Sequence, residues 1–353
     1  MLVDESEDSY VYTRLAELIR NQIFSDQLTG RVPGIRQLAR QYSINFKTAN
    51  KAISILISEG LLYRHKGKGT FVVDTSKRPG DLITIGLILP DIVNPYFAKL
   101  AQSLQRTALT QEMAVLVNTS YSDPDTLAQT LKLYRTRGIR AIIVQGGVVH
   151  NHRSLRTIMN SNIPVIGTHT HIPDIDDVQP DVQAGAHIAT EHLLENFGPN
   201  IAYICGSDEP IMKTGRFFGF RDALLSKGYR VNMGYLKKAP PTYKGGYEAA
   251  MQVMKKNPKP RSIFVYNQIM AMGVVSAIRH LGCEIPFDVA VAGCDDSVDE
   301  REMLVPTTSV SFSFEETANL LLSLVDRRLK NPAAEPVTYR VSPKLIVRKS
   351  TMR

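Results

Sequence analysis

The sequence contains no tryptophan and only three cysteines, Cys205, Cys283 and Cys294, with no Cys-x-x-Cys spacing. This excludes a disulfide framework and argues against a structural zinc site. No apolar stretch approaches the roughly 18 residues needed to cross a bilayer. The first ten residues, MLVDESEDSY, lack the apolar region of a secretory signal. We therefore expect a protein of the reducing cytoplasm with free thiols.

Basic charge is abundant instead, and it is unevenly distributed over the 353 residues, whose formal net charge is +8. Residues 1–9 hold four acidic side chains and no basic one, and residues 10–78 hold twelve Lys or Arg against four Asp or Glu. Residues 79–353 hold thirty basic against twenty-six acidic side chains. The length suits two domains. The charge placement predicts a small nucleic-acid-binding module followed by a larger, nearly neutral domain.

The first 75 residues have the pattern of three helices and a hairpin. Apolar positions at helical spacing predict helices over 10–25, 36–42 and 46–58. Apolar runs at 61–63 and 70–73 flank the basic, glycine-rich segment RHKGKG and predict two strands with a tight basic tip. Two short helices joined by a turn, followed by such a hairpin, make a winged helix-turn-helix.

The third helix is the candidate recognition helix. Asn45 is expected to cap it and Gly60 to end it. Its apolar positions form one buried stripe: Ala49, Ala52, Ile53 and Leu56. Its polar positions are expected on the exposed side: Lys47, Thr48, Asn50 and Lys51. The glycines of the hairpin tip let backbone amides approach phosphates closely.

The string Gly67-Lys68-Gly69-Thr70 also invites comparison with a nucleotide-binding phosphate loop. That loop ends in Gly-Lys-Ser/Thr and has a further glycine at a fixed distance upstream. Here Gly-Lys is followed by glycine, and Leu62 stands where the upstream glycine is required. The segment is therefore interpreted as a wing tip.

Residues 10–73 resemble the GntR-type winged-helix domain through Pro33-x-x-Arg36-x-Leu38-Ala39, Thr48-x-x-x-Ala52, Glu59-Gly60-Leu61 and Gly67-Lys68-Gly69-Thr70-Phe71-Val72. The resemblance implies that the third helix enters the major groove and that the wing touches the DNA backbone or minor groove. Together with the polar face of that helix, the candidate DNA-binding residues are Arg36, Asn45, Phe46, Lys47, Thr48, Lys51, Lys66, Gly67, Lys68 and Thr70.

The recognition helix departs from the family at its start, where Asn45-Phe46 replaces the common Ser-Arg. Asn45 can still cap the helix and donate a hydrogen bond. Phe46 cannot make a guanidinium contact, so it either meets a thymine methyl group or belongs to the core.

After a linker at 76–81, short β-branched runs alternate with helical stretches. The predicted strands are 83–89, 114–117, 141–144, 164–167, 201–205, 262–265 and 289–292. This pattern predicts an α/β fold, a two-subdomain doubly wound parallel sheet. With the winged helix at 8–75, the larger domain covers 82–353. Its first subdomain is expected at about 82–180 and 310–341, and its second at about 181–309 and 342–350.

A ligand crevice is expected at the carboxyl ends of these strands. The polar and aromatic residues there suit a small polyhydroxylated ligand. The candidates are Asp91, Tyr96, Phe97, Gln145, His169, Arg216, Asn267 and Asp295. Two alternatives stay open: Asp295-Asp296 could form a capping turn, and Arg216 could serve in an interface ion pair. His169 and His171, like His150 and His152, have a metal-compatible spacing but no third ligand, so no metal or cofactor is expected.

Residues 83–348 resemble the core of LacI-type regulators, which shares the periplasmic sugar-binding fold. The motifs are Asp91-x-x-Asn94-Pro95-Tyr96-Phe97, Arg216-x-x-Gly219-Phe220, Asn267-x-x-x-Ala271-x-Gly273 and Ile285-Pro286-x-Asp288 running on to Gly293-x-Asp295-Asp296. The resemblance implies effector contacts at Asp91, Tyr96 or Phe97, Arg216, Asn267 and Asp295. It also implies three crossovers between subdomains, near 179–181, 308–310 and 341–342.

One position departs from this second family pattern. The family's Asn-Asp pair is Asn267-Gln268 here, which leaves the identity of a sugar effector open. The two resemblances together predict a homodimeric, ligand-controlled DNA-binding regulator, a repressor of a sugar-utilisation operon that binds a two-fold operator.

Two other functions remain alternatives. One is a sugar- or nucleotide-modifying enzyme, because doubly wound sheets host many chemistries. Against it, the chain has no phosphate loop, no G-x-G-x-x-G after the first strand and no G-x-S-x-G elbow. The other is an exported solute-binding protein, which the winged helix argues against. We therefore expect a protein that is not an enzyme.

Overall fold

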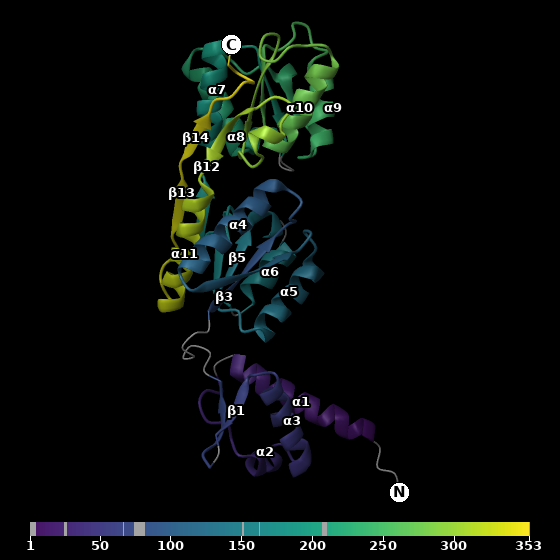
Figure 1. Ribbon diagram of the computed structural model, residues 1–353, viewed down its shortest axis with the longest axis vertical. Helices are drawn as coiled ribbons and strands as arrows, with labels where there is room; N and C mark the ends of the chain where they lie inside the picture. The colour runs from purple at the N-terminus through teal and green to yellow at the C-terminus, as the bar shows by residue number, and fades with distance from the viewer. Residues whose placement is uncertain are drawn as a thin grey trace.

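The computed structural model describes residues 5–24, 27–65, 67–73, 82–149, 152–161, 163–206 and 210–352 (Figure 1). The predicted linker at 76–81, Lys66 and His150 lie outside these residues. Figure 1 shows a small N-terminal unit below two α/β subdomains that are stacked one above the other. None of the helices in the described part of the chain has the length and apolar character needed to span a bilayer.

The N-terminal unit is a winged helix. Its elements are α1 (Glu5–Phe24), α2 (Ile35–Gln41), α3 (Phe46–Ser58), β1 (Leu62–His65) and β2 (Gly69–Val72). The two strands pair antiparallel, with His65 opposite Gly69. The predicted stripe of α3 is buried against α1. Helix α1 begins at Glu5, whereas the predicted helix began at residue 10, where the helical spacing of apolar residues starts.

Thr48 is a correction to the expected polar face of α3. The residue is only 4 % exposed. It lies four positions before Ala52, so the helical repeat places it on the buried stripe beside Ala49.

The first subdomain is built on a six-stranded sheet in the order β13-β7-β6-β5-β3-β4, and all its neighbouring strands are parallel. Its strands are β3 (Ile83–Leu89), β4 (Met113–Thr119), β5 (Ile142–Gln145), β6 (Val165–Thr168), β7 (Asp176–Pro180) and β13 (Thr338–Val341). Its helices are α4 (Pro95–Thr110), α5 (Pro124–Thr136), α6 (His152–Met159) and α11 (Phe314–Lys330). Strand β3 shows why both faces are covered. Ile85, Leu87 and Leu89 join the core that includes residues of α4, while Ile88 joins the core that includes α5.

The second subdomain repeats this plan with the strand order β14-β12-β11-β10-β8-β9, in which only β14 runs antiparallel to its neighbour. Its strands are β8 (Ile201–Cys205), β9 (Leu236–Lys238), β10 (Ser262–Val265), β11 (Ala290–Cys294), β12 (Thr308–Phe312) and β14 (Pro343–Ile346). Its helices are α7 (Val182–Phe197), α8 (Gly215–Ser226), α9 (Tyr243–Val253) and α10 (Gln268–His280). The doubly wound α/β prediction is confirmed.

The chain passes between the sheets three times. It leaves the first sheet after β7, returns to it after β12, and crosses again between β13 and β14. The second passage was expected near 308–310, and that position is wrong. Residues 308–312 form a complete strand of the second sheet, and Ser313 then caps α11 by accepting a hydrogen bond from the Glu316 amide. The β-branched pattern Thr-Ser-Val-Ser-Phe continues the strand beyond the predicted crossover.

Candidate functional site

The N-terminus of α3 is exposed, and one capping hydrogen bond stabilises it. Asn45 Oδ1 accepts a hydrogen bond from the Thr48 amide at 2.7 Å, which confirms the predicted cap. Phe46 is the first residue of the helix, and it is 51 % exposed. The core alternative for Phe46 is therefore wrong. An exposed aromatic ring at this helix end is free to meet an apolar group in a DNA groove.

Two lysines of α3 lie on its exposed side, as predicted. Lys47 and Lys51 are both exposed. The Lys51 Nζ lies 4.1 Å from the centroid of the Tyr12 ring of α1. This cation–π contact holds the Lys51 ammonium at the surface between α1 and α3.

The wing is connected to the recognition helix by a side-chain hydrogen bond. Arg64 Nη2 donates to Asn50 Oδ1 at 2.6 Å. At the tip, Gly67 adopts a φ of +78°, a conformation that favours glycine, and Lys68 is exposed. Thr70 is half-buried in β2, and its carbonyl accepts from the Val32 amide at 2.9 Å.

Arg36 occupies the second position of α2 and is exposed. Together with Lys47 and Lys68 it places exposed positive charge on α2, α3 and the wing tip. Thr48 is only 4 % exposed, so we do not count it with this surface.

The second candidate site lies where the two subdomains meet, and we call it the inter-subdomain site. It comprises Tyr96 and His169 of the first subdomain and Arg216, Tyr266 and Asp295 of the second. Its centre is an ion pair in which Arg216 Nη2 donates to Asp295 Oδ1 at 3.0 Å. The two side chains are only 9 % and 14 % exposed, respectively. Burial raises the pKa of Asp295, and the Arg216 charge opposes that shift.

Arg216 retains unused hydrogen-bonding capacity. Within the residues that the structure describes, its Nε is buried and has no hydrogen-bond partner. Its guanidinium lies 4.4 Å from the centroid of the Tyr266 ring. A buried donor without a partner is costly, so this atom is an expected contact point for an acceptor that a ligand would bring.

Asp295 belongs to a strained turn immediately after β11. Asp295 and Asp296 have φ values of +85° and +41°, in the region that most side chains avoid. The Asp295 amide donates to the Val310 carbonyl at 2.8 Å. The turn fastens β11 to β12 and aims the Asp295 carboxylate at Arg216. This turn caps no helix in the described part of the chain, where Asp299 caps the helical turn that follows, and the Arg216–Asp295 ion pair lies within the second subdomain.

Two aromatic side chains at the start of α4 divide their roles. Tyr96 packs on Phe314 of α11 with ring centroids 5.4 Å apart. Burial raises the pKa of Tyr96, and Asp295 raises it further. This coupling places Tyr96 beside the ion pair of the second subdomain. Phe97 packs against the core and against the edge of the Tyr96 ring, at 5.6 Å between centroids.

His169 reaches the site from the loop after β6. Burial, Arg216 and His171 together lower its pKa to about 3, so the ring is neutral at physiological pH. The rings of His169 and His171 meet edge to face at 5.1 Å. Among the residues that the structure describes, no three His, Cys, Asp or Glu side chains form a metal-binding group.

The remaining three candidates use one oxygen each for local hydrogen bonds. Asp91 Oδ1 accepts from the Asn94 amide at 2.8 Å, Gln145 Oε1 from the Gly147 amide at 2.7 Å, and Asn267 Oδ1 from the Met270 amide at 2.9 Å. These bonds shape the loops at the strand ends. Within the described residues, the second polar atom of each side chain makes no further hydrogen bond.

Sequence reasoning missed Tyr266 and Lys99. Tyr266 directly follows β10, so a polar aromatic at a strand end was the available signal. Lys99 lies one turn after Tyr96 on α4, and its Nζ donates to the Asp296 carbonyl at 3.3 Å across the subdomain boundary. Nothing in the linear sequence indicates that contact.

Gln268 has a structural role. It is fully buried, and its Oε1 accepts from the Val298 amide at 2.6 Å. The side chain therefore anchors the loop that follows the Asp295 turn. The change from the family's acidic residue at this position does not alter the groups we assign to the inter-subdomain site.

Comparison with known protein families covers both parts of the chain. Residues 10–72 match the bacterial regulatory proteins of the gntR family, and residues 190–351 match a periplasmic binding protein-like domain. The chain joins a GntR-type DNA-binding domain to a periplasmic binding protein-like domain. This is the domain composition of a ligand-responsive transcriptional regulator, and it agrees with the charge division seen in the sequence.

Individual relatives are distant. The HTH-type transcriptional repressor PurR of Mannheimia succiniciproducens is 24 % identical over 272 residues, which span 76 % of this chain and 81 % of that protein. The structure of the regulator CelR in complex with cellobiose matches 90 % of this chain and 100 % of its own, with a TM-score of 0.68 and 19 % identity. A LacI-family regulator from Enterococcus faecium with bound ribose matches 76 % of this chain and 98 % of its own, with a TM-score of 0.67 and 22 % identity.

Proposed function

We propose that this GntR-type protein is a repressor of a sugar-utilisation operon, and that a small carbohydrate releases it from DNA. The observation that carries the proposal is the inter-subdomain site. There the Arg216 of a buried Arg216–Asp295 pair has an Nε without a hydrogen-bond partner in the described part of the chain, at the boundary between two subdomains. The GntR-type domain supplies the exposed basic surface that would meet an operator.

The proposed mechanism couples the two sites through subdomain closure. A carbohydrate hydroxyl accepts from Arg216 Nε, while Asp295 accepts from a neighbouring hydroxyl and Tyr96 packs on the apolar face of the ring. Because these groups come from both subdomains, a ligand that contacts them all favours a closed arrangement. Closure changes the spacing of two winged helices and thereby their fit to a two-fold operator.

The proposed contact residues are the candidates from the sequence, without Thr48, which is buried. For DNA they are Arg36, Asn45, Phe46, Lys47, Lys51, Lys66, Gly67, Lys68 and Thr70. For the effector they are Asp91, Tyr96, Phe97, Gln145, His169, Arg216, Asn267 and Asp295, with Tyr266 added. The proposed domain limits are 8–75 for DNA binding and 82–353 for effector binding and dimerisation. The place of action is the cytoplasm, where the operator lies.

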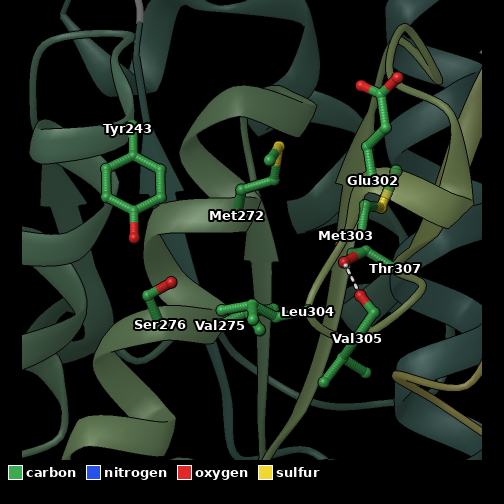
Figure 2. Close-up of a pocket in the computed structure, with 9 residues that line it drawn as sticks. All are labelled: Tyr243, Met272, Val275, Ser276, Glu302, Met303, Leu304, Val305 and Thr307. Atoms are coloured by element: carbon green, nitrogen blue, oxygen red, sulfur yellow. Dashed lines mark hydrogen bonds between the residues drawn. The ribbon is translucent and has the colours of Figure 1, made fainter.

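A homodimer requires a self-complementary surface, and one candidate lies on the second subdomain. A pocket with a volume of about 220 Å³ lies between the helices α9 and α10 and the segment 302–307. Figure 2 shows the residues that line it. Leu304 is 68 % exposed and Tyr243 is 47 % exposed beside it. Met272 and Val275 of α10 complete an apolar wall. Exposed apolar side chains around a concavity are typical of an interface, and we assign this one to a second copy of the chain.

The DNA-binding part is tested by selecting bound duplexes from a random library and measuring affinity for the selected sequence at several salt concentrations. We expect a Lys47→Ala/Lys68→Ala variant to bind all DNA more weakly. The slope of log K against log salt should flatten by about 0.9 for each phosphate that the variant no longer neutralises. Lys256→Ala, an exposed lysine of the second subdomain, is the matched control and keeps the wild-type slope. A wild-type slope in the double variant would remove these two lysines from the DNA surface.

The effector part is tested by thermal shift with a panel of free sugars and sugar phosphates. One ligand is expected to raise the melting temperature, and that ligand should lower the affinity for the selected DNA. Arg216→Met should abolish both responses. A panel member that is chemically converted by the protein would instead support an enzyme.

A further inference from the structure

Asp177 is a fully buried carboxylate beneath the loop that presents His169. Its Oδ2 accepts from the amide and the hydroxyl of Thr170, both at 3.1 Å. The same oxygen accepts from the His171 amide and from Gln179 Nε2, both at 2.9 Å. A buried charge is tolerated only when its hydrogen bonds are satisfied, so this arrangement ties the loop firmly to β7.

The loop adopts a conformation that needs such a tie. His169 and His171 have φ values of +59° and +57°, in the left-handed region that residues other than glycine seldom adopt. Their rings are therefore aimed by a backbone that would relax without support. The carboxylate supplies that support by binding two successive amides, those of Thr170 and His171.

Two glycines make the arrangement possible by removing a side chain at the points of closest approach. A Cβ on Gly167 would lie 2.5 Å from Thr170 Oγ1 and 2.8 Å from Asp177 Oδ1. A Cβ on Gly146 would lie 2.0 Å from the His169 carbonyl oxygen. The loop is thus held from β6, β7 and the strand end of β5 together.

The consequence reaches the inter-subdomain site through His169. The charged or titratable groups that act on its ring are Arg216 from α8 and His171 from its own loop, both of which disfavour a second positive charge. The ring is neutral and keeps one acceptor nitrogen as well as one N–H donor. Arg216 offers only donors, so a neutral imidazole beside it widens the range of ligand hydroxyl contacts.

We propose that Asp177 is the positioning residue of the inter-subdomain site: it holds the His169 loop so that an uncharged imidazole faces Arg216 and the effector. The part concerning the effector rests on the proposed function. The part concerning His169 can be measured without any ligand. In a variant that lacks the Asp177 charge, the loop relaxes into solvent and His169 regains an ordinary pKa.

The decisive measurement is the NMR titration of histidine ring signals in the full-length protein, with His169 assigned through a His169→Gln variant. The wild-type His169 signals should not titrate between pH 5 and 8. In Asp177→Asn they should titrate with a midpoint within about one unit of 6.5, the ordinary histidine value. A folded Asp177→Asn protein in which the His169 ring signals do not titrate between pH 5 and 8 would overturn the proposal.

Asp176→Asn is the matched control, because Asp176 is equally buried on the same strand but pairs with Arg327 and Arg328 of α11. His169 should remain silent in that variant. Titration of His169 in both variants would mean that either change loosens the whole subdomain, and it would also overturn the positioning role of Asp177.

Thr170→Val removes one donor to Asp177 and keeps the side-chain shape, so it serves if Asp177→Asn does not fold. We expect faster amide hydrogen exchange at residues 170 and 171 in this variant and unchanged exchange in β3. Unchanged exchange at 170 and 171 would contradict the proposal.

Sugar affinity, compared between the wild type and Asp177→Asn, tests the role of Asp177 in effector binding. D-ribose and D-cellobiose, the sugars bound in the two structural neighbours, are the probes. Whichever binds the wild type should bind Asp177→Asn at least tenfold more weakly at pH 5.5, with partial recovery at pH 8, where His169 is neutral again. Equal affinity in both proteins would refute the positioning role. If neither sugar binds the wild type, the proposed effector class fails, while the NMR result still decides the role of Asp177.

Discussion

The Arg216–Asp295 ion pair provides the sharpest quantitative prediction. The 3.0 Å contact is almost fully withdrawn from water, with side-chain exposures of 9 % and 14 %. At an effective dielectric constant of about 20, two unit charges at this distance attract by roughly 5 kcal/mol, part of which desolvation offsets. Removing one partner leaves the other buried and unpaired. We therefore expect Asp295→Asn and Arg216→Met each to lower the free energy of unfolding by about 3 kcal/mol.

The double variant should cost much less than the sum of the single ones. Removing both charges together leaves neither stranded, so Arg216→Met/Asp295→Asn should cost about 3 to 4 kcal/mol instead of about 6, a coupling of about 2 to 3 kcal/mol. For a domain of this size, a single variant would melt on the order of 10 °C lower. Urea unfolding followed by circular dichroism measures all four proteins of the cycle.

A surface pair provides the control for this cycle. Lys244 and Glu248 form an i,i+4 ion pair on α9 with side-chain exposures of 83 % and 57 %. Their cycle should give a coupling of no more than about 0.5 kcal/mol. If the Arg216 and Asp295 variants also add within about 0.5 kcal/mol, the two charges do not stabilise one another and the electrostatic account of the site is wrong.

Three further changes probe other parts of the molecule. Asn45→Ala removes the cap of α3 and should destabilise the GntR-type domain by about 1 kcal/mol. Thermal unfolding measures this change in the melting transition of that domain. Leu304→Glu places a charge on the proposed dimer surface and should convert dimers to monomers in sedimentation velocity, without changing the circular dichroism spectrum; a dimeric variant would locate the interface elsewhere. Because the pKa of His169 is about 3 in the folded state and about 6.5 when unfolded, its neutral form stabilises the protein above pH 6.5, and this contribution is lost as pH falls toward 3. His169→Gln should therefore reduce the dependence of stability on pH between about 6.5 and 5 by up to about 1.4 kcal/mol per unit, whereas an unchanged slope would show that His169 is not buried as a neutral ring.

Local patterns in the sequence were sufficient for the elements whose information lies within a few residues. The third helix was predicted at 46–58, and it runs from Phe46 to Ser58, because an Asn cap, an apolar stripe and a glycine after its end are all local signals. Strand β3 was predicted at 83–89 and observed there, since it is a continuous apolar run covered on both faces. The division of charge between the two domains was also readable directly.

Strand β7 shows where local patterns fail. Its sequence, Asp-Asp-Val-Gln-Pro, has the composition of a loop, and it forms a strand in which both carboxylates have partners outside the strand. Asp176 binds Arg327 and Arg328, which follow it by about 150 residues, and Asp177 binds the neighbouring loop. Burial of such groups is favourable only when those partners are in place.

The sequence by itself determined the two domains, their class and most of the residues that gather at the strand ends. Only the tertiary structure decided how those residues act on one another. Arg216 and Asp295 are 79 positions apart, and parallel strands bring their loops to one edge. Tyr266 contacts Arg216, and Asp177 binds the amides of the loop that carries His169. These contacts depend on long-range packing, because packing sets the direction of each side chain and its exposure to water. The spacing of residues along the chain determines neither the direction nor the exposure.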